Sequence, residues 1–183
     1  MQHSRSYVKL YTGPMRSGKT TSMYRDVEKL QYARKRCVII KYDRDNRYSN
    51  GAILVNNNGV KLQRVPIAQS GKKLLSCEYD FNDIDVIGID ECQFYDDLPE
   101  FICKYACDKI IILSGLDSDF RGKLFGRIAE IFPLCNYIEK LSAVCECGDE
   151  ALYSSRITNE TECEVIGSDI YKSVCRECFH QHK

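Results

Sequence analysis

The stretch GPMRSGKT, residues 13–20, carries glycine, lysine and threonine in the order G-x-x-x-x-G-K-[ST]. Glycines let the backbone curve around an anion with its N–H groups pointing inward, at the positive end of a following helix. The lysine adds a mobile charge for the outer phosphates, and the threonine hydroxyl can ligate Mg²⁺. We interpret the loop as a cradle for a nucleoside triphosphate; the alternative is a glycine turn with a solvated lysine. The cradle comprises Gly13, Pro14, Met15, Arg16, Ser17, Gly18, Lys19 and Thr20.

A second stretch, VIGIDECQF, places Asp90 and Glu91 directly after an apolar run. Ligands of open α/β sheets bind at the carboxyl ends of the strands, where such a pair would lie. Because successive strand residues point to opposite sides, the two carboxylates need different roles. One can hold Mg²⁺ and the other can take a proton from a nucleophile. The alternative is an acidic pair that only caps a neighbouring helix.

The elements that must position these residues can be predicted from periodicity. Four short runs rich in Val and Ile indicate strands buried on both faces, at residues 7–12, 36–42, 84–90 and 108–115. Helices are predicted over residues 20–35, where apolar side chains recur near helical spacing, and over residues 98–109, with Pro99 in the first turn. This alternation favours an α/β fold with a mostly parallel sheet. From about residue 145, cysteine pairs, short strands and a polar tail indicate a small separate lobe.

Composition limits the classes of function. A chain of 183 residues supports one main domain with a small appendage. Lys plus Arg (26) balance Asp plus Glu (26), so no positive field favours a nucleic-acid partner. No apolar stretch reaches the roughly 20 residues of a membrane span and the start lacks a signal-peptide core, so a soluble, cytoplasmic protein is expected. Of the eleven cysteines, seven stand singly in apolar segments, and we expect most of these to be reduced and buried.

Several strings, taken together and in this order, resemble thymidine kinases of the cellular and poxvirus type: GPMRSGKT, IKYDRDNRYS, GIDECQF, GLDSDFRGKLFG, KLSAVC and ECEVIGSDIYKSVCREC. The resemblance runs from about residue 9 to residue 178. It implies transfer of the γ-phosphoryl of ATP to the 5′-hydroxyl of thymidine, giving thymidine monophosphate. It also implies a RecA-like P-loop kinase domain over residues 1–142 and a small zinc-binding lobe with a substrate-wrapping loop over residues 143–183. A cytoplasmic homotetramer and feedback inhibition by thymidine triphosphate are further implications.

The same resemblance assigns roles to single residues. Glu91 matches the general base, and Asp90 and Gln93 are assigned to the nucleotide and Mg²⁺ side of the site. Asp45 and Arg47 match a pair near the sugar and the transferring phosphate, for which the alternative is an ordinary surface ion pair. The residues that match the nucleoside pocket are Met15, Leu116, Phe120, Cys163, Glu164, Val165, Ile166, Gly167 and Tyr171. Without the resemblance, the aromatic residues among them would be assigned to the core.

The C-terminal cysteines depart from the family pattern. Cys175 and Cys178 form C-x-x-C, the spacing with which two thiolates bind one tetrahedral Zn²⁺, but Cys145 and Cys147 form C-x-C where the family usually has C-x-x-C. Two close pairs separated by 27 residues still predict a structural zinc site. Four free thiols without metal are one alternative. The other is a substitute ligand, namely Cys163, His180 or His182.

Two other classes of protein share parts of these patterns. A nucleic-acid-dependent ATPase would carry the phosphate loop and the acidic pair, but also a basic stripe and further motor motifs. A zinc-ribbon binding module would explain the cysteines and leave the nucleotide half unexplained. Departures from the family pattern at Cys92, Ser118, Asp119 and Gly122 leave both acids in place, while the range of nucleoside acceptors stays open.

Overall fold

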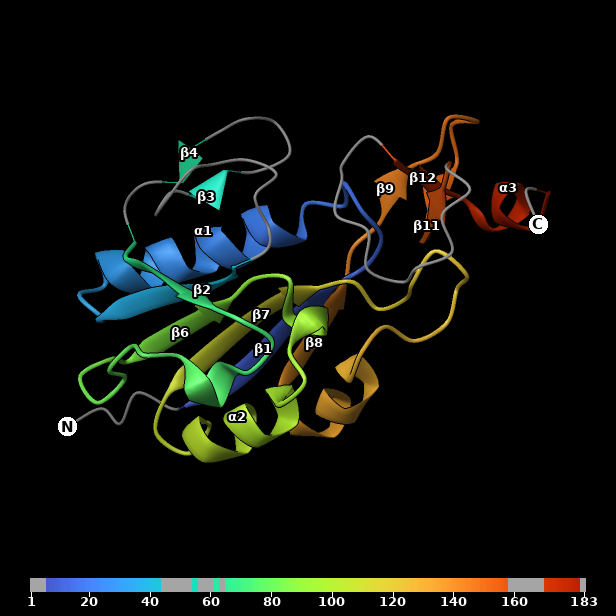
Figure 1. Ribbon diagram of the computed structural model, residues 1–183. Helices are drawn as coiled ribbons and strands as arrows, with labels where there is room; N and C mark the ends of the chain where they lie inside the picture. Colours follow the sequence, from blue (N-terminus) through green and yellow to red (C-terminus); the bar gives the residue numbers. More distant parts are fainter. Residues whose placement is uncertain (1–5, 44–53, 56–60, 63–64, 158–169, 182–183) are drawn as a thin grey trace.

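The computed structural model describes residues 6–43, 54–55, 61–62, 65–157 and 170–181. Six strands, every neighbouring pair parallel, form a central sheet in the order β5-β2-β6-β7-β1-β8 (Figure 1). Their bounds are β1 Tyr7–Thr12, β2 Cys37–Tyr42, β5 Ile67–Ser70, β6 Val86–Ile89, β7 Ile110–Gly115 and β8 Tyr137–Lys140. The predicted α/β fold with a mostly parallel sheet is confirmed. A short antiparallel pair, β3 Leu54–Val55 and β4 Lys61–Leu62, stands apart from this sheet.

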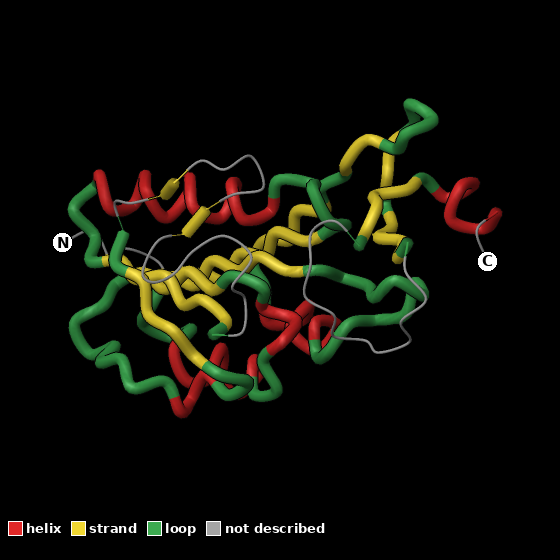
Figure 2. The backbone as a smooth tube through the Cα atoms, turned by 45° about the horizontal axis from the view of Figure 1, so that its top comes forward, coloured by secondary structure: helices red, strands yellow, loops and turns green. Residues whose placement is uncertain are grey.

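Helices cover both faces of the sheet. Helix α1, Lys19–Tyr32, lies on one face, and α2, Leu98–Tyr105, lies on the other beside the 3₁₀ segment η3, Ile128–Leu134 (Figure 2). Both predicted helices begin within a residue of the expected position and end earlier than expected. Helix α1 stops because Arg34 takes a φ of 64°, the left-handed conformation that commonly follows a helix end. Among the described residues, no helix combines the length and apolar character needed to cross a bilayer.

Alternation along the strands produces two separate cores. In β2, Val38 and Ile40 belong to the larger core on the α2 face, whereas Cys37 and Ile39 belong to the core beneath α1. The same alternation holds in the other central strands, as expected when a parallel sheet is covered on both faces.

Gly88 fixes how closely helix α1 approaches the sheet. A Cβ atom at this position would lie 2.9 Å from Cγ1 of Ile39, 3.0 Å from Sδ of Met23 and 3.2 Å from Cγ2 of Val27. Two of these neighbours belong to α1, so the helix lies on β6 at a distance that only glycine permits. The helix that starts at the phosphate loop is therefore seated directly on the strand that leads to the acidic pair.

The C-terminal segment forms a lobe with its own small core. Its elements are β9 Ala143–Val144, β10 Glu150–Ala151, β11 Tyr153–Arg156, β12 Tyr171–Val174 and α3 Arg176–Gln181. Strand β9 pairs with β10 and β11 pairs with β12, both antiparallel. Figure 1 shows β9, β11, β12 and α3, orange to red, on the right-hand side of the molecule. Ala151, Val174 and Phe179 pack there with two of the paired cysteines.

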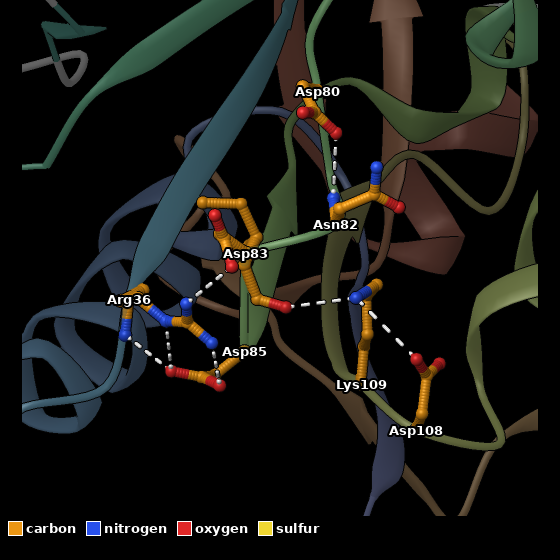
Figure 3. A network of polar contacts seen from close by, with 8 residues as sticks. Arg36, Asp80, Asn82, Asp83, Asp85, Asp108 and Lys109 are labelled. Atoms are coloured by element: carbon orange, nitrogen blue, oxygen red, sulfur yellow. Dashed lines mark hydrogen bonds and ion pairs between the residues drawn. The ribbon is translucent and has the colours of Figure 1, made fainter.

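Polar contacts join the segments just before β2, β6 and β7, and Figure 3 draws them. The Arg36 side chain donates to both carboxylate oxygens of Asp85, at 3.3 Å and 3.2 Å, and its guanidinium also lies 2.9 Å from Asp83. The Arg36 backbone N–H adds a 2.8 Å bond to Asp85. Nearby, the ammonium of Lys109 donates to the carbonyl of Ile84 at 3.0 Å. These bonds tie together the segments that enter β2, β6 and β7.

Asp85 should make stability depend on pH in acid. Its hydrogen bonds with the Arg36 guanidinium lower the pKa of the Asp85 carboxyl in the folded protein. A lowered folded pKa contributes stability that is present above the unfolded pKa of about 4 and is lost as the pH falls below it. We therefore expect Asp85→Asn to be slightly less stable at pH 7 and to lose less stability on acidification than wild type. Urea unfolding at stepped pH measures this, and parallel pH profiles for the two proteins would contradict it.

The expectation that most singly placed cysteines are buried is wrong. Among the described ones, Cys37 and Cys92 are buried, whereas Cys103 and Cys107 are exposed. Helix α2 buries Phe101 and Ile102 against the sheet, so Cys103 falls on its outer side. All ten described cysteines are free thiols, in agreement with the expected reduced state.

Candidate active site

The phosphate loop has the backbone that its glycines predict. Gly13 has a φ of 135°, and a Cβ atom there would collide with the carbonyl oxygen of Leu141. Arg16 and Gly18, with φ of 60° and 85°, also take left-handed conformations that turn the chain. Gly18 is the N-cap of α1, so the loop ends where the helix offers free N–H groups. The predicted sequence of strand, loop and helix is confirmed, and its geometry suits an anion.

Lys19 lies against the loop that precedes it. Its side chain is largely buried, and its ammonium donates to the carbonyl of Pro14 at 2.5 Å and to the hydroxyl of Ser17 at 3.4 Å. The Ser17 hydroxyl in turn donates to the Pro14 carbonyl at 2.8 Å. The Lys19 ammonium is thus held beside Pro14 and Ser17 of the loop. A phosphate oxygen would be a stronger acceptor than this carbonyl and this hydroxyl, and would replace them.

Asp90 joins the phosphate loop to the sheet. Its Oδ1 atom accepts hydrogen bonds from the hydroxyl of Thr20 at 2.9 Å and from the hydroxyl of Ser114 at 2.5 Å. Hydroxyl and carboxylate oxygens are the ligand types that Mg²⁺ prefers, so Thr20 and Asp90 can hold this ion together. Sequence reasoning missed Ser114, although a lone hydroxyl near the end of the apolar run IIILSG was a usable signal.

Glu91 lies in a turn and not on the strand, because β6 ends at Ile89. Its φ of 49° is left-handed, which costs a non-glycine residue about 1–3 kcal/mol. The amide of Gln93 donates to Oε2 of Glu91 at 2.6 Å and accepts from the backbone N–H of Leu116 at 3.0 Å. Gln93 is almost fully buried, so it holds the Glu91 carboxylate in one orientation. The two carboxylates were expected to point to opposite sides because of strand alternation. The structure instead separates them by the turn at Glu91, because the strand has already ended.

Arg156 brings two predicted pocket residues together. Its guanidinium carbon lies 3.9 Å from the ring centroid of Phe120 and 5.1 Å from that of Tyr171, and it donates to the Tyr171 hydroxyl at 2.5 Å. Phe120 and Tyr171 are thus linked although they are 51 positions apart in the chain. Sequence reasoning missed Arg156, since nothing in the run ALYSSR marks it as part of a site.

Several predicted site residues cannot be placed. Asp45 and Arg47 fall within residues 44–53, which lie outside the described residues. The range 158–169 also lies outside them, and it contains Cys163, Glu164, Val165, Ile166 and Gly167. Met15 and Leu116 are described: the main chain of Met15 bonds to the C-terminal lobe, and Leu116 bonds to Gln93.

The four paired cysteines gather at one point despite the shortened C-x-C spacing. The sulfur atoms of Cys145, Cys147, Cys175 and Cys178 all lie within 4.8 Å of one another. The sulfurs of Cys147 and Cys175 are 3.7 Å apart, close to the roughly 3.8 Å that four tetrahedral Zn–S bonds of about 2.3 Å require. The Cys145 N–H bonds to the carbonyl of Asp149 at 2.8 Å and closes the turn that carries the first pair.

The charges of these thiols favour a bound cation. Backbone N–H groups of Cys147 and Cys175 lower the pKa of Cys145 to about 6. Hydrogen bonds with Cys175, Cys145 and Cys147 raise the pKa of Cys178 to about 12, and repulsion by a Cys145 thiolate adds to this increase. A dication removes this repulsion, and thiolate is a ligand that Zn²⁺ binds well. The residues present therefore fit a four-cysteine zinc site.

A parallel sheet with a phosphate loop after its first strand and an Asp-Glu pair after β6 defines a P-loop nucleotide-binding protein. Comparison with known proteins narrows this class. The family model described as thymidine kinase matches residues 6–179. The chain is 42% identical to the thymidine kinase of Vaccinia virus (strain Ankara), and 41% identical to those of Variola virus (isolate Human/India/Ind3/1967) and Monkeypox virus. Each comparison spans 176 residues and covers 94% of this chain and 96% of the relative. The chain belongs to the thymidine kinase family, as the sequence motifs predicted.

Proposed function

We propose that this chain transfers the γ-phosphoryl of ATP to the 5′-hydroxyl of thymidine, giving thymidine monophosphate and ADP. Membership of the thymidine kinase family supports the reaction. The observation that carries it is the bond between Thr20 and Asp90, which joins the phosphate loop to the acidic stretch after β6. A nucleotide phosphate on the loop would therefore lie close to the turn that presents Glu91.

Different residues of the chain take up the proton, hold the phosphates and bind the metal ion. Glu91 accepts the proton that the 5′-hydroxyl loses as its oxygen bonds to the γ-phosphorus, and ADP leaves with the electrons of the broken P–O bond. Lys19 and the loop N–H groups hold the phosphates in place. Thr20 and Asp90 would hold Mg²⁺, which would neutralise developing charge on the phosphate oxygens when bound. Positioning supplies much of the rate, because phosphoryl transfer needs little covalent help from the protein.

The nucleoside pocket is assigned to the side of the site nearest the lobe. Phe120 and Tyr171 would contact the base, and their link through Arg156 supports a shared location. Met15 and Leu116 would line an apolar side of the pocket. Residues 163–167 would complete it with main-chain contacts, and Asp45 and Arg47 would bind the sugar and the transferring phosphate. A pocket of this kind reads shape and hydrogen bonds.

Further assignments rest on the family. A kinase domain over residues 1–142 and a zinc lobe over residues 143–183 agree with the separate small core around Ala151, Val174 and Phe179. Zn²⁺ would crosslink the two cysteine pairs and hold the lobe together. A homotetramer, a cytoplasmic location and feedback inhibition by thymidine triphosphate complete the proposal. Exposed apolar side chains on the edge strand β8, Tyr137 and Ile138, are compatible with contacts between copies.

Transfer of labelled γ-phosphate from ATP to each of the four common deoxynucleosides tests the proposed reaction. We expect thymidine to be labelled, deoxyuridine analogues with a small 5-substituent to be accepted, and deoxycytidine to be refused. A missing methyl group discriminates by only about 1–3 kcal/mol, so analogues are a weak test and deoxycytidine a strong one. Added thymidine triphosphate should suppress transfer. ATP hydrolysis without labelling of any nucleoside by metal-replete protein would refute the kinase assignment.

A further inference from the structure

The β11–β12 hairpin presents four polar side chains on one face. Ser154 of β11 lies opposite Ser173 of β12, and Arg156 lies opposite Tyr171. Residues two apart on a strand share a face, so the serine pair and the Arg156–Tyr171 pair stand side by side. One rung of the hairpin therefore consists of two hydroxyls, and the next consists of a cation and an aromatic ring.

The serine pair holds the main chain of the phosphate loop. The N–H of Met15 donates to the hydroxyl of Ser154 at 2.9 Å, and the hydroxyl of Ser173 donates to the carbonyl of Met15 at 2.5 Å. Met15, Ser154 and Ser173 are exposed by only 8%, 3% and 8%. Water cannot readily replace either bond at this burial, so removing a hydroxyl leaves a buried backbone group without its partner. The lobe thus fixes both polar groups of one loop residue.

The second pair on the same face holds Phe120. Arg156 stacks on this ring at 3.9 Å and bonds to the hydroxyl of Tyr171, an arrangement in which a cation is attracted to the ring face. The hairpin is anchored in turn at the cysteine cluster, because Cys175 follows β12 directly. One short two-stranded element therefore connects the phosphate loop, Phe120 and the cysteine cluster.

We propose that Ser154 and Ser173 are positioning residues that set the phosphate loop through Met15 and couple nucleotide binding to nucleoside binding through the hairpin. The identities of the two ligands rest on the proposed function. A loop already held at residue 15 loses less freedom when its N–H groups take up a phosphate. A nucleoside that contacts Phe120 and Tyr171 restricts the hairpin, so the phosphate loop loses still less conformational freedom when the nucleotide binds. Each ligand therefore tightens the binding of the other by the same factor.

Removing either hydroxyl tests the positioning role. For Ser154→Ala and Ser173→Ala we expect the Kd for Mg–ADP to rise about 3- to 10-fold, as loss of one buried hydrogen bond predicts. The KM for ATP should rise by a similar factor, while kcat changes less than about twofold because Glu91 is untouched. Amide hydrogen exchange of a peptide covering residues 13–20 should become faster in the free protein. The matched control is Ser155→Ala, which removes a serine hydroxyl from the opposite face of the same strand. Its Kd for Mg–ADP, KM for ATP and loop exchange should equal those of wild type.

Coupling is measured by the factor with which thymidine tightens Mg–ADP binding. This factor should fall toward one in both serine variants and stay at the wild-type value in Ser155→Ala. Wild-type Mg–ADP affinity, loop exchange and coupling in a folded Ser154→Ala or Ser173→Ala would overturn the proposal. If one variant fails to fold, the other decides; if neither folds, the serines are needed for folding and the positioning role is rejected. If wild type never labels thymidine but the serine variants still show altered nucleotide affinity and loop exchange, the proposed function is refuted and the positioning role is not.

Discussion

Glu91→Gln should bind Mg–ADP as wild type does and phosphorylate thymidine about 10²- to 10⁴-fold more slowly, the usual contribution of a general base. The substitution keeps the size of the side chain, and its amide oxygen can still accept the 2.6 Å bond from Gln93. The left-handed turn at position 91 should also persist, since the backbone requirement is unchanged. Only the capacity to take up the proton of the 5′-hydroxyl is lost.

Two measurements separate this role from a role in binding. Equilibrium titration with Mg–ADP should give a Kd within about twofold of wild type, and single-turnover transfer should show the whole loss in the chemical step. Asp90→Asn is the contrasting variant, one residue earlier. Because Asp90 accepts from Thr20 and Ser114, its neutralisation should weaken the response to Mg²⁺ and nucleotide binding together. If Glu91→Gln turns over at a rate close to that of wild type, Glu91 is not the general base.

Cys147→Ser should weaken the zinc binding that we propose for the lobe and abolish most of the activity. Cys147 belongs to the shortened C-x-C pair, and its sulfur lies 3.7 Å from that of Cys175. With three thiolates in place of four, zinc binding weakens steeply, and the free energy of zinc binding is also free energy of folding for a small lobe. Since the lobe holds Met15 and Phe120, we expect kcat/KM to fall at least about tenfold and Tm to drop by several degrees.

Metal analysis decides this prediction. Wild type purified without chelator should carry about one zinc per chain, and Cys147→Ser less than half of one. Cys103→Ser is the matched control, because it removes an exposed thiol outside the cluster and should keep both metal and activity. Thiol titration adds a second readout: four thiols of wild type should react only after chelation. A wild-type zinc content below half per chain, with all four thiols freely reactive, would favour ordinary cysteines.

The sequence was sufficient for the parts of the fold that depend on local pattern. Runs of Val and Ile predicted β1, β2, β6 and β7, because a parallel strand covered on both faces is mostly apolar. The phosphate loop and the cysteine pairs were also predictable, since their chemistry needs fixed residue types at fixed spacing. The end of α1 was missed, because nothing in the residue type of Arg34 announces a left-handed turn.

Contacts between distant segments could not be predicted in the same way. Ser154 and Ser173 reach Met15 across 139 and 158 residues, and this depends on the register of a hairpin and on how the lobe packs. Serine in a short strand is common and carries no mark of such a role. Arg156 is similar: a stacked guanidinium is recognisable only when the two rings beside it have been located.

All six strands of the sheet run the same way, and this has a practical consequence for attaching other molecules to the protein. Strand β1 begins at Tyr7 and reaches the phosphate loop six residues later, a rise of about 20 Å. An affinity tag or fluorescent protein joined ahead of Tyr7 would therefore enter the sheet at the opposite end of β1 from the loop. A fusion at the carboxyl end would follow α3, which begins beside Cys175. The segment that leads into β1 is thus a better attachment point for immobilising this protein than the segment that follows α3.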